Sequence, residues 1–296
     1  MRLACACAAL AFLAGCASVS APTAVQTPGC LSDIDVDRLL ADINARSPAA
    51  DMPETMTMPD ARCTRAKLLQ RLSGQAGRLA GYKVGLTNPE VQKRFYTDRP
   101  VWGALYDGML LTSGATVDAA FGAHPLLEAD LLVRVKDDAI NRARTPAEVL
   151  ANVDEIIPFI ELPDLMVQTP TALNGVGISA INVGARLGVR GVPVSVPADA
   201  DAQATLLEQL RDMKVRLVDE QGTQLGDGTG SDVLGHPLNA VTWLARTLQV
   251  EGLSLRPGQL VSLGSFSALL PPKPGQKITV HYDGIANFQP VSVSFR

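Results

Sequence analysis

The stretch Leu-Leu-Glu-Ala-Asp-Leu-Leu-Val-Arg-Val, residues 126–135, has the clearest strand pattern in the chain. Side chains alternate between the two faces of a strand, so every second residue shares a face. One face is apolar and carries Leu127, Ala129, Leu131, Val133 and Val135. The other carries Glu128 and Asp130, two carboxylates that could share a hard cation such as Mg²⁺ or Mn²⁺. An exposed strand face, on which acidic residues are ordinary, is the alternative.

A third acidic residue, Glu161, ends the apolar stretch 156–160. A carboxylate at the end of a buried strand must be paired, protonated or bound to a metal ion. Glu161 could therefore complete a set of three oxygen ligands with Glu128 and Asp130. The alternative is a side chain that emerges into solvent where the strand ends.

Other short apolar stretches, separated by Gly, Pro and Asp, predict further strands. They cover residues 155–162, 179–183, 214–219, 223–225, 259–263, 276–282 and 291–295. One helix interrupts them, opening at His236-Pro237 and ending at Gly252. The glycine-rich stretch 226–230 lacks the lysine of a phosphate-binding loop, so we interpret it as a plain loop. We therefore expect an α+β fold, with one strand-rich domain over residues 81–296.

Residues 32–80 show helical rather than strand periodicity. Ser32 can cap a first helix, whose buried side would carry Ile34, Leu39, Leu40 and Ile43. A second helix is predicted over 60–72, with Ala66, Leu69 and Leu72 on its buried side and Arg65, Lys67 and Arg71 on its polar side. Together these helices predict a small N-terminal helical cap.

The first 31 residues have the pattern of an export signal and a tether. Arg2 precedes an uncharged run, residues 3–15, that is too short to span a bilayer and is typical of a secretory signal peptide. Leu13-Ala14-Gly15-Cys16 resembles a bacterial lipobox, so residues 1–15 would be removed and Cys16 would carry lipid. The protein would then be anchored to a membrane by lipid alone, facing the periplasm, with 16–31 as tether. A wrongly assigned N-terminus, and hence a cytoplasmic protein, is the alternative.

Composition and charge limit the kinds of ligand and partner that this chain is expected to bind. The 296 residues carry 26 Lys and Arg against 30 Asp and Glu, without a basic run, which disfavours nucleic acid. Aromatic residues, at 4%, are too few for a stacking platform, so a small polar substrate is expected. Cys30 and Cys63, which remain after the signal and Cys16, could pair in an oxidising compartment.

Several motifs, in this order, resemble the 2-keto-4-pentenoate hydratase branch of the fumarylacetoacetate hydrolase superfamily. They are Gly-Tyr-Lys-Val-Gly-Leu-Thr at 81–87, Trp-Gly-Ala-Leu-Tyr-Asp-Gly-Met at 102–109, Glu-Ala-Asp at 128–130, Phe-Ile-Glu-Leu-Pro-Asp at 159–164, the Gly-His-Pro helix opening within 234–245, and 257–265. The resemblance covers about residues 80–296. It implies a distorted, strand-rich roll or barrel that binds Mg²⁺ or Mn²⁺ through Glu128, Asp130 and Glu161.

The resemblance also implies an activity and roles for further residues. The cation would chelate a small 2-oxo acid, and water would be added to a 2-hydroxy-dienoate or 2-oxo-enoate. Lys83 would pair with enolate charge or move a proton, and Asp107 would assist proton transfer. Ser265, with Gly264, would bind the substrate carboxylate. Members of this family are usually dimers or larger, so a homo-oligomer is implied.

Three departures from the family pattern keep other functions open. Asp130 stands where the family has glutamate, Asn174-Gly175 stands where it has an Asp-Asn pair, and Leu165-Met166 lacks the usual arginine. A metal-dependent decarboxylase or C–C hydrolase of a 2-oxo acid is the first alternative. A lipoprotein that binds an oxo acid without turning it over is the second.

Overall fold

The computed structural model describes residues 25–296. The expected signal peptide, the lipidation site Cys16 and tether residues 16–24 lie outside the described residues. Within residues 25–296, no helix combines the length and apolar character needed to cross a bilayer.

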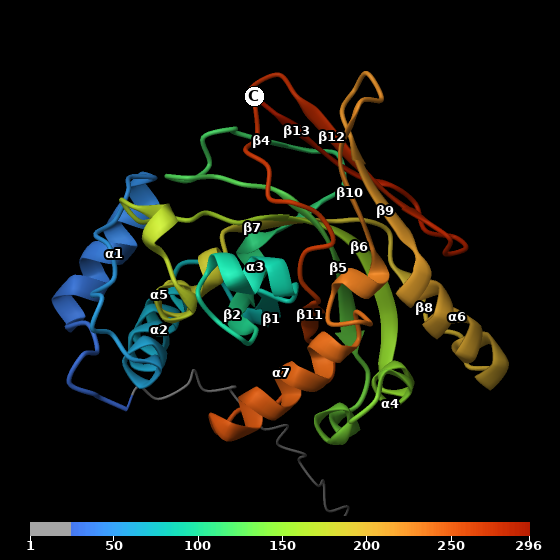
Figure 1. The fold of residues 1–296 in the computed structure, drawn as a ribbon, viewed down its shortest axis with the longest axis horizontal. Helices are drawn as coiled ribbons and strands as arrows, with labels where there is room; N and C mark the ends of the chain where they lie inside the picture. The colour runs from blue at the N-terminus through green and yellow to red at the C-terminus, as the bar shows by residue number, and fades with distance from the viewer. Residues whose placement is uncertain (1–24) are drawn as a thin grey trace, which may run out of the picture.

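Two sheets form the body of the molecule (Figure 1). The first is 8-stranded and runs in the order β2 (Val101–Tyr106), β1 (Leu79–Gly85), β11 (Leu260–Ser262), β5 (Glu128–Val135), β6 (Val153–Leu162), β7 (Leu187–Arg190) and β3 (Leu110–Thr112), with β8 (Val194–Ser195) paired to β6. The second is 5-stranded, in the order β10 (Gln224–Thr229), β9 (Lys214–Val218), β12 (Lys277–Asp283), β13 (Val291–Phe295) and β4 (Ala115–Val117). The first sheet curls, which confirms the expected mixed α+β roll.

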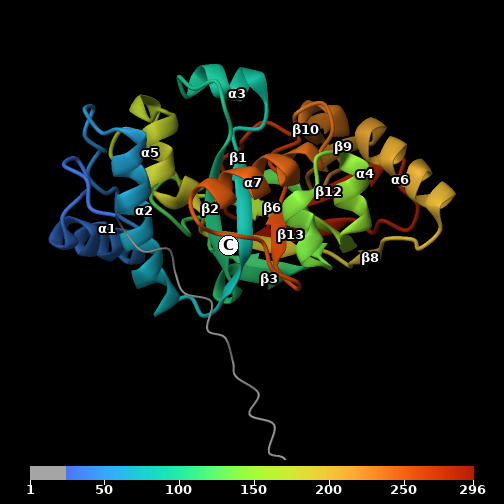
Figure 2. The same ribbon diagram turned by 90° about the horizontal axis from the view of Figure 1, so that it is seen from below.

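Seven α-helices surround the sheets in the described part of the chain. They are α1 (Asp33–Ala45), α2 (Met58–Ser73), α3 (Pro89–Arg94), α4 (Pro146–Ala151), α5 (Gly175–Ala180), α6 (Ala200–Asp212) and α7 (Asn239–Val250). In Figure 1, α1, α2 and α5 gather at one end of the molecule and α6 lies at the other. Figure 2 shows α3 standing out from the body on the side of β1.

Strand β5 occupies the middle of the larger sheet, between β11 and β6. This position buries it on both faces, so Leu131 and Leu132 are both fully inaccessible. Glu128 and Asp130 are buried with them, at 8% and 0% exposure. The alternative of a solvent-exposed acidic face is therefore excluded.

The first N-terminal helix begins where Ser32 predicts, whereas the second begins at Met58, two residues before the predicted Asp60. Ser32 caps α1, and Thr57 caps α2 in a reciprocal capping box with Asp60. The expected disulfide between Cys30 and Cys63 is present and ties the segment before α1 to α2. The expected buried position of Ile34 is wrong, because this side chain is 71% exposed and Val36 takes its place in the core.

The predicted polar side of α2 is also wrong for Arg65 and Lys67, which are buried. The Arg65 guanidinium lies 3.6 Å from the ring centre of Trp102 and donates to Glu251 at 2.6 Å. Lys67 donates to the Leu31 carbonyl oxygen at 2.9 Å. Long cationic side chains can be buried when their charged ends find such partners, which periodicity alone does not reveal.

Three further expectations need correction. The predicted strand 179–183 is instead the end of α5 followed by a 3₁₀ turn, Asn182–Gly184. Most of the predicted loop 226–230 belongs to β10, because its backbone pairs with β9 despite its glycines. Helices α3, α4 and α6 were not expected, because 236–252 was the one helix predicted after residue 81.

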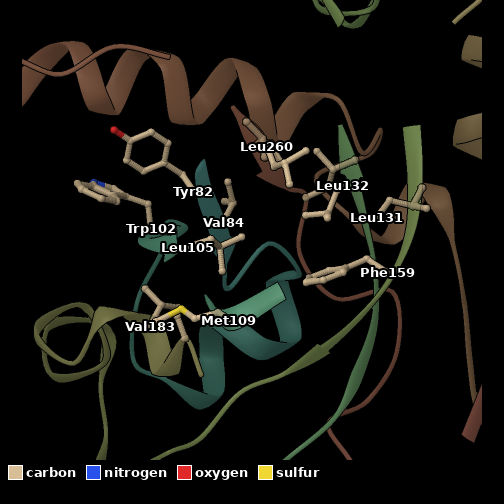
Figure 3. Close-up of a cluster of buried hydrophobic side chains, with 14 of the residues drawn as sticks. Tyr82, Val84, Trp102, Leu105, Met109, Leu131, Leu132, Phe159, Val183 and Leu260 are labelled. Atoms are coloured by element: carbon tan, nitrogen blue, oxygen red, sulfur yellow. The ribbon is translucent and has the colours of Figure 1, made fainter. Parts of the chain in front are cut away.

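The core is continuous from the N-terminal helices into the larger sheet. Figure 3 shows its centre, where Tyr82 and Trp102 lie next to each other on neighbouring strands. Their rings meet edge to face, with 5.5 Å between centroids. The two N-terminal helices share this core rather than forming a separate one, and the Tyr106 hydroxyl on β2 donates to the Leu69 carbonyl oxygen of α2 at 2.9 Å.

Candidate active site

Two glutamates face each other across neighbouring central strands. The register of β5 and β6 places Glu128 directly opposite Glu161. Lys83, on β1, reaches the same place from across the sheet, and its Nζ donates to Glu161 Oε1 and, at 3.0 Å, to the Val183 carbonyl oxygen. Lys83 and Glu161 are 3% and 1% exposed, so this is a buried ion pair. The sequence prediction that these three residues belong to one site agrees with this placement.

The buried cluster carries more negative than positive charge. Burial, and then the charge of Glu161, raise the pKa of Glu128 well above its usual range. Glu161 Oε2 is buried and has no hydrogen-bond partner among residues 25–296. A divalent cation bound through one or two carboxylates would satisfy both groups and offset their repulsion, so Glu128 and Glu161 fit such an ion.

The carboxylate of Asp130, predicted as a third ligand, is already hydrogen-bonded within the fold. Its carboxylate accepts hydrogen bonds from the Ser262 hydroxyl and from the backbone N–H groups of Leu131, Leu263 and Gly264, the last three at 2.6, 3.1 and 3.0 Å. Burial, followed by the charge of Glu161, raises its pKa well above the usual range. Asp130 therefore holds the turn that follows β11.

The predicted set of three carboxylate ligands is not assembled. In the part of the chain that the structure describes, no three acidic, histidine or cysteine side chains are grouped so that they could hold a metal ion. The aspartate at 130 is one methylene shorter than glutamate, and its oxygens already bind the turn after β11. The pair Glu128 and Glu161 is the part of the predicted set that could hold a cation here.

A cavity of about 210 Å³ opens beside this pair. Lys83, Glu128 and Ser265 line it, together with an apolar wall formed by Leu86, Val91, Phe95, Pro163, Leu165, Ile178, Val183, Ala268 and Leu269. Gly264 precedes Ser265 with a φ of +105°, and a Cβ there would lie 2.3 Å from Thr87 Oγ1. Glycine is therefore required at 264 to bring the Ser265 loop against β1.

Asp107 does not lie in this cavity. It follows β2, whose register puts Tyr106 opposite Leu79, at the far end of β1 from Lys83. Its half-exposed carboxylate pairs with Arg78 at 3.1 Å and lines a separate, larger cavity of about 1480 Å³. The structure therefore separates Asp107 from the cavity of Lys83 and Glu128, where it was predicted to assist proton transfer.

Asn182 and Val183 were missed as site residues. Both have left-handed backbone conformations, with φ of 57° and 54°, which is costly for a β-branched residue such as Val183. The Asn182 side chain fixes this turn by bonding to Ala104, accepting from its N–H at 2.7 Å and donating to its carbonyl oxygen at 3.0 Å. The turn thereby presents the Val183 carbonyl oxygen to Lys83. Asn182 and Gly184 are residue types that favour such a turn, but the apolar neighbours predicted a strand instead.

The other departures have local structural roles. Asn174 caps α5 by accepting from the N–H groups of Val176 and Gly177, at 3.0 and 2.8 Å. Leu165, where the arginine is missing, contributes to the apolar wall of the cavity. His236 accepts from the Leu238 N–H at 3.1 Å, as expected of a helix-opening residue.

Comparisons with known proteins agree with this architecture. No protein-family model matches the chain. The chain is 28% identical to a 2-keto-4-pentenoate hydratase of Paraburkholderia xenovorans over 241 residues, 81% of this chain and 86% of the relative. It is equally identical, over 237 residues, to a 4-oxalocrotonate decarboxylase of Pseudomonas putida, with 80% and 86% covered.

A solved structure extends the likeness to three dimensions. The 4-oxalocrotonate decarboxylase of Pseudomonas putida G7, complexed with magnesium and adipate, superposes with a TM-score of 0.75 at 25% identity. The match covers 89% of this chain and 97% of that protein. The similarity therefore extends well beyond the predicted motifs, to nearly the whole of the described chain.

Proposed function

We propose that this chain, a member of the 2-keto-4-pentenoate hydratase branch of the fumarylacetoacetate hydrolase superfamily, is a divalent-metal-dependent hydratase. Its reaction adds water to a small 2-hydroxy-dienoate or 2-oxo-enoate. The observation that carries the proposal is the buried pair Glu128 and Glu161 with Lys83 beside it, of which Glu128 and Lys83 line a small cavity. The named hydratase and the magnesium-bound neighbour support the same activity and cofactor.

Glu128 and Glu161 would hold Mg²⁺ or Mn²⁺. The chemistry that such an ion supplies when bound is stabilisation of the negative charge that develops on the oxygens of a 2-oxo acid. Lys83 keeps an ammonium group at the same inner end of the cavity, where it can stabilise enolate charge and transfer a proton from Nζ. Ser265 and the apolar wall would orient the substrate and exclude bulk water.

A turnover assay tests this function. The protein without residues 1–16 is incubated with Mg²⁺ or Mn²⁺ and 2-hydroxypenta-2,4-dienoate, and loss of dienoate absorbance is followed together with formation of the 4-hydroxy-2-oxo acid. We expect cation-dependent turnover that EDTA abolishes. Tight binding of the 2-oxo acid without product would favour the non-catalytic alternative and contradict the proposal.

Decarboxylation is the second candidate reaction. It is favoured by the 4-oxalocrotonate decarboxylases, to which the chain is as similar as to the hydratases. Release of CO₂ from 4-oxalocrotonate, measured beside hydration in the same preparation, distinguishes the two reactions. C–C bond hydrolysis has no comparable support among these relatives.

We also propose that the protein is exported and anchored by lipid on Cys16. The disulfide between Cys30 and Cys63 supports an oxidising compartment. Expression in a bacterial host with a radiolabelled fatty acid tests the anchor, with Cys16→Ser as the variant that should lose label and membrane association. A homo-oligomer, proposed from the family, is tested by light scattering of the purified protein.

A further inference from the structure

The mouth of the cavity carries a cation that the proposed reaction does not use. Arg94, the last residue of α3, lines the cavity that contains Lys83 and Glu128. Its side chain is exposed, whereas Lys83 and Glu128 are buried at 3% and 8% exposure. Arg94 therefore lies toward solvent and the two buried groups lie at the inner end. Figure 2 shows α3 at the outer edge of the molecule, in keeping with this arrangement.

The guanidinium of Arg94 is available for a ligand. Lys93, its neighbour, pairs with Glu90 at 2.7 Å, but within residues 25–296 no carboxylate pairs with Arg94. The ring centre of Phe95, the next residue, lies 5.7 Å from the guanidinium carbon of Arg94. Lys83, the other cation that lines the cavity, already contacts Glu161.

Hydrogen bonds hold the backbone of α3 in place, although the Arg94 side chain forms no ion pair within residues 25–296. Asn88 caps α3, and Gln92 donates from its side chain to the Leu86 carbonyl oxygen at 2.8 Å. The Phe95 carbonyl oxygen accepts from the Gly175 N–H at 2.7 Å, which ties the end of α3 to α5. A cation mounted on a fixed element can select a ligand at lower entropic cost than one on a mobile loop.

We propose that Arg94 is a specificity-determining residue that binds a second carboxylate, at the far end of the substrate. This inference rests on the proposed function, because it takes the 2-oxo acid group to lie at the Glu128 and Glu161 end. The rest of the lining is mostly apolar, with residues such as Val91 and Leu165. A ligand with an anionic head, an apolar middle and an anionic tail matches this lining. The preferred substrate is therefore a 2-oxo dicarboxylic acid, and a monocarboxylic acid such as 2-hydroxypenta-2,4-dienoate would be turned over but bound more weakly.

Two 2-oxo acids of equal chain length, one with and one without a distal carboxylate, isolate the contribution of that carboxylate to binding. Binding of 2-oxoadipate and 2-oxohexanoate, which differ only in the distal carboxylate, is measured by titration calorimetry in the presence of Mg²⁺. We expect the unmodified protein to bind 2-oxoadipate about tenfold more tightly, as a charge-assisted Arg–carboxylate hydrogen bond allows. Arg94→Gln should remove this preference without changing the affinity for 2-oxohexanoate, and Arg94→Lys should retain part of it.

Lys93→Gln is the matched control, since it removes the same charge from the same helix at a residue that does not line the cavity. It should leave the preference intact. Equal binding of both acids by the unmodified protein, an equal loss for both acids in Arg94→Gln, or the same effect from Lys93→Gln would overturn the assignment. Failure to bind even 2-oxohexanoate with Mg²⁺ would instead contradict the proposed function, so the two failures are distinguishable.

Discussion

At the scale of single residues, the site consists of charges that the protein buries without fully compensating them. Glu128 and Glu161 face each other, and one ammonium, that of Lys83, lies beside them. Burying charge is costly unless each group is paired. Glu161 Oε2 is buried without a hydrogen-bond partner among residues 25–296, and this is the strongest indication that the site binds a cation.

Replacing Lys83 with methionine should separate chemistry from binding. The change removes the proton donor at the inner end of the cavity, so kcat for dienoate hydration should fall by about 100-fold or more. Mn²⁺ should still bind, because Glu128 and Glu161 remain. Steady-state kinetics and Mn²⁺ titration of the same preparation test both statements. Retained kcat in Lys83→Met would exclude Lys83 as a proton-transferring group.

At the scale of elements, short turns and caps hold the site residues in place. The turn Asn182–Gly184 presents the Val183 carbonyl oxygen to Lys83, and the two hydrogen bonds of Asn182 to Ala104 fix it on β2. Asp130 similarly holds the turn after β11 that leads to Ser265. These contacts make the positions of Lys83 and Ser265 depend on residues outside the cavity.

Asn182→Ala tests the turn. It removes both bonds to Ala104 and places alanine in a left-handed conformation, so we expect a loss of about 2–3 kcal/mol in the free energy of unfolding. It should also lower kcat, since Lys83 loses a fixed partner. Urea unfolding and kinetics provide the two readouts, with Asn44→Ala on the exposed side of α1 as control. An unchanged free energy of unfolding would show that the turn does not need Asn182.

Asp60 gives the N-terminal helices a defined pH dependence. Hydrogen bonds from Thr27, and then from Thr57, lower the pKa of Asp60 from 3.8 to about 2. Because the folded pKa lies below the unfolded one, the ionised carboxylate stabilises the fold above about pH 4, and this contribution is lost as the pH falls toward 2. Asp60→Asn should therefore lower Tm at pH 7 and differ less from the unmodified protein near pH 2.

The control for Asp60 is Glu54→Gln, an acidic residue exposed just before α2. Its Tm should follow that of the unmodified protein at every pH. A Tm difference for Asp60→Asn that stays constant between pH 7 and pH 2 would contradict the assigned titration.

At the scale of the whole molecule, the sequence predicts what is local and misses what is brought together by the fold. The alternation in residues 126–135 is a property of one strand, so β5 and its acidic pair could be predicted from it. The contacts of Lys83 with Glu161 and Val183 span 78 and 100 residues, and no local pattern encodes them. The motif that contains Lys83 indicated its importance, but the same kind of argument misplaced Asp107.

The sequence also failed to predict which residues are buried and which conformation some apolar stretches adopt. Arg65 reads as surface by periodicity, but Glu251 and Trp102, distant in sequence, give it buried partners. Residues 179–183 read as strand because Ile181 and Val183 are β-branched, and only the cap of α5 by Asn174 and the packing of α5 against α2 settle the conformation at the start of this stretch.

The disulfide between Cys30 and Cys63 stabilises the whole chain without touching the site. It closes a loop of 33 residues, for which restriction of the unfolded chain corresponds to about 3–4 kcal/mol. Cys30→Ser with Cys63→Ser should therefore lower Tm while leaving kcat unchanged at temperatures where the variant is folded. Thermal unfolding followed by circular dichroism measures the first effect. An equal Tm with and without the cysteines would argue against the disulfide in the purified protein.

Mn²⁺ binding to the Glu128 and Glu161 pair tests the central claim most directly. Calorimetric titration is compared for the unmodified protein, Glu128→Gln and Glu161→Gln, with Glu155→Gln, at the other end of β6, as control. We expect one site that weakens at least about tenfold in each of the first two variants and is unchanged in the third. Equal affinity in all four proteins, or no binding to the unmodified one, would contradict it.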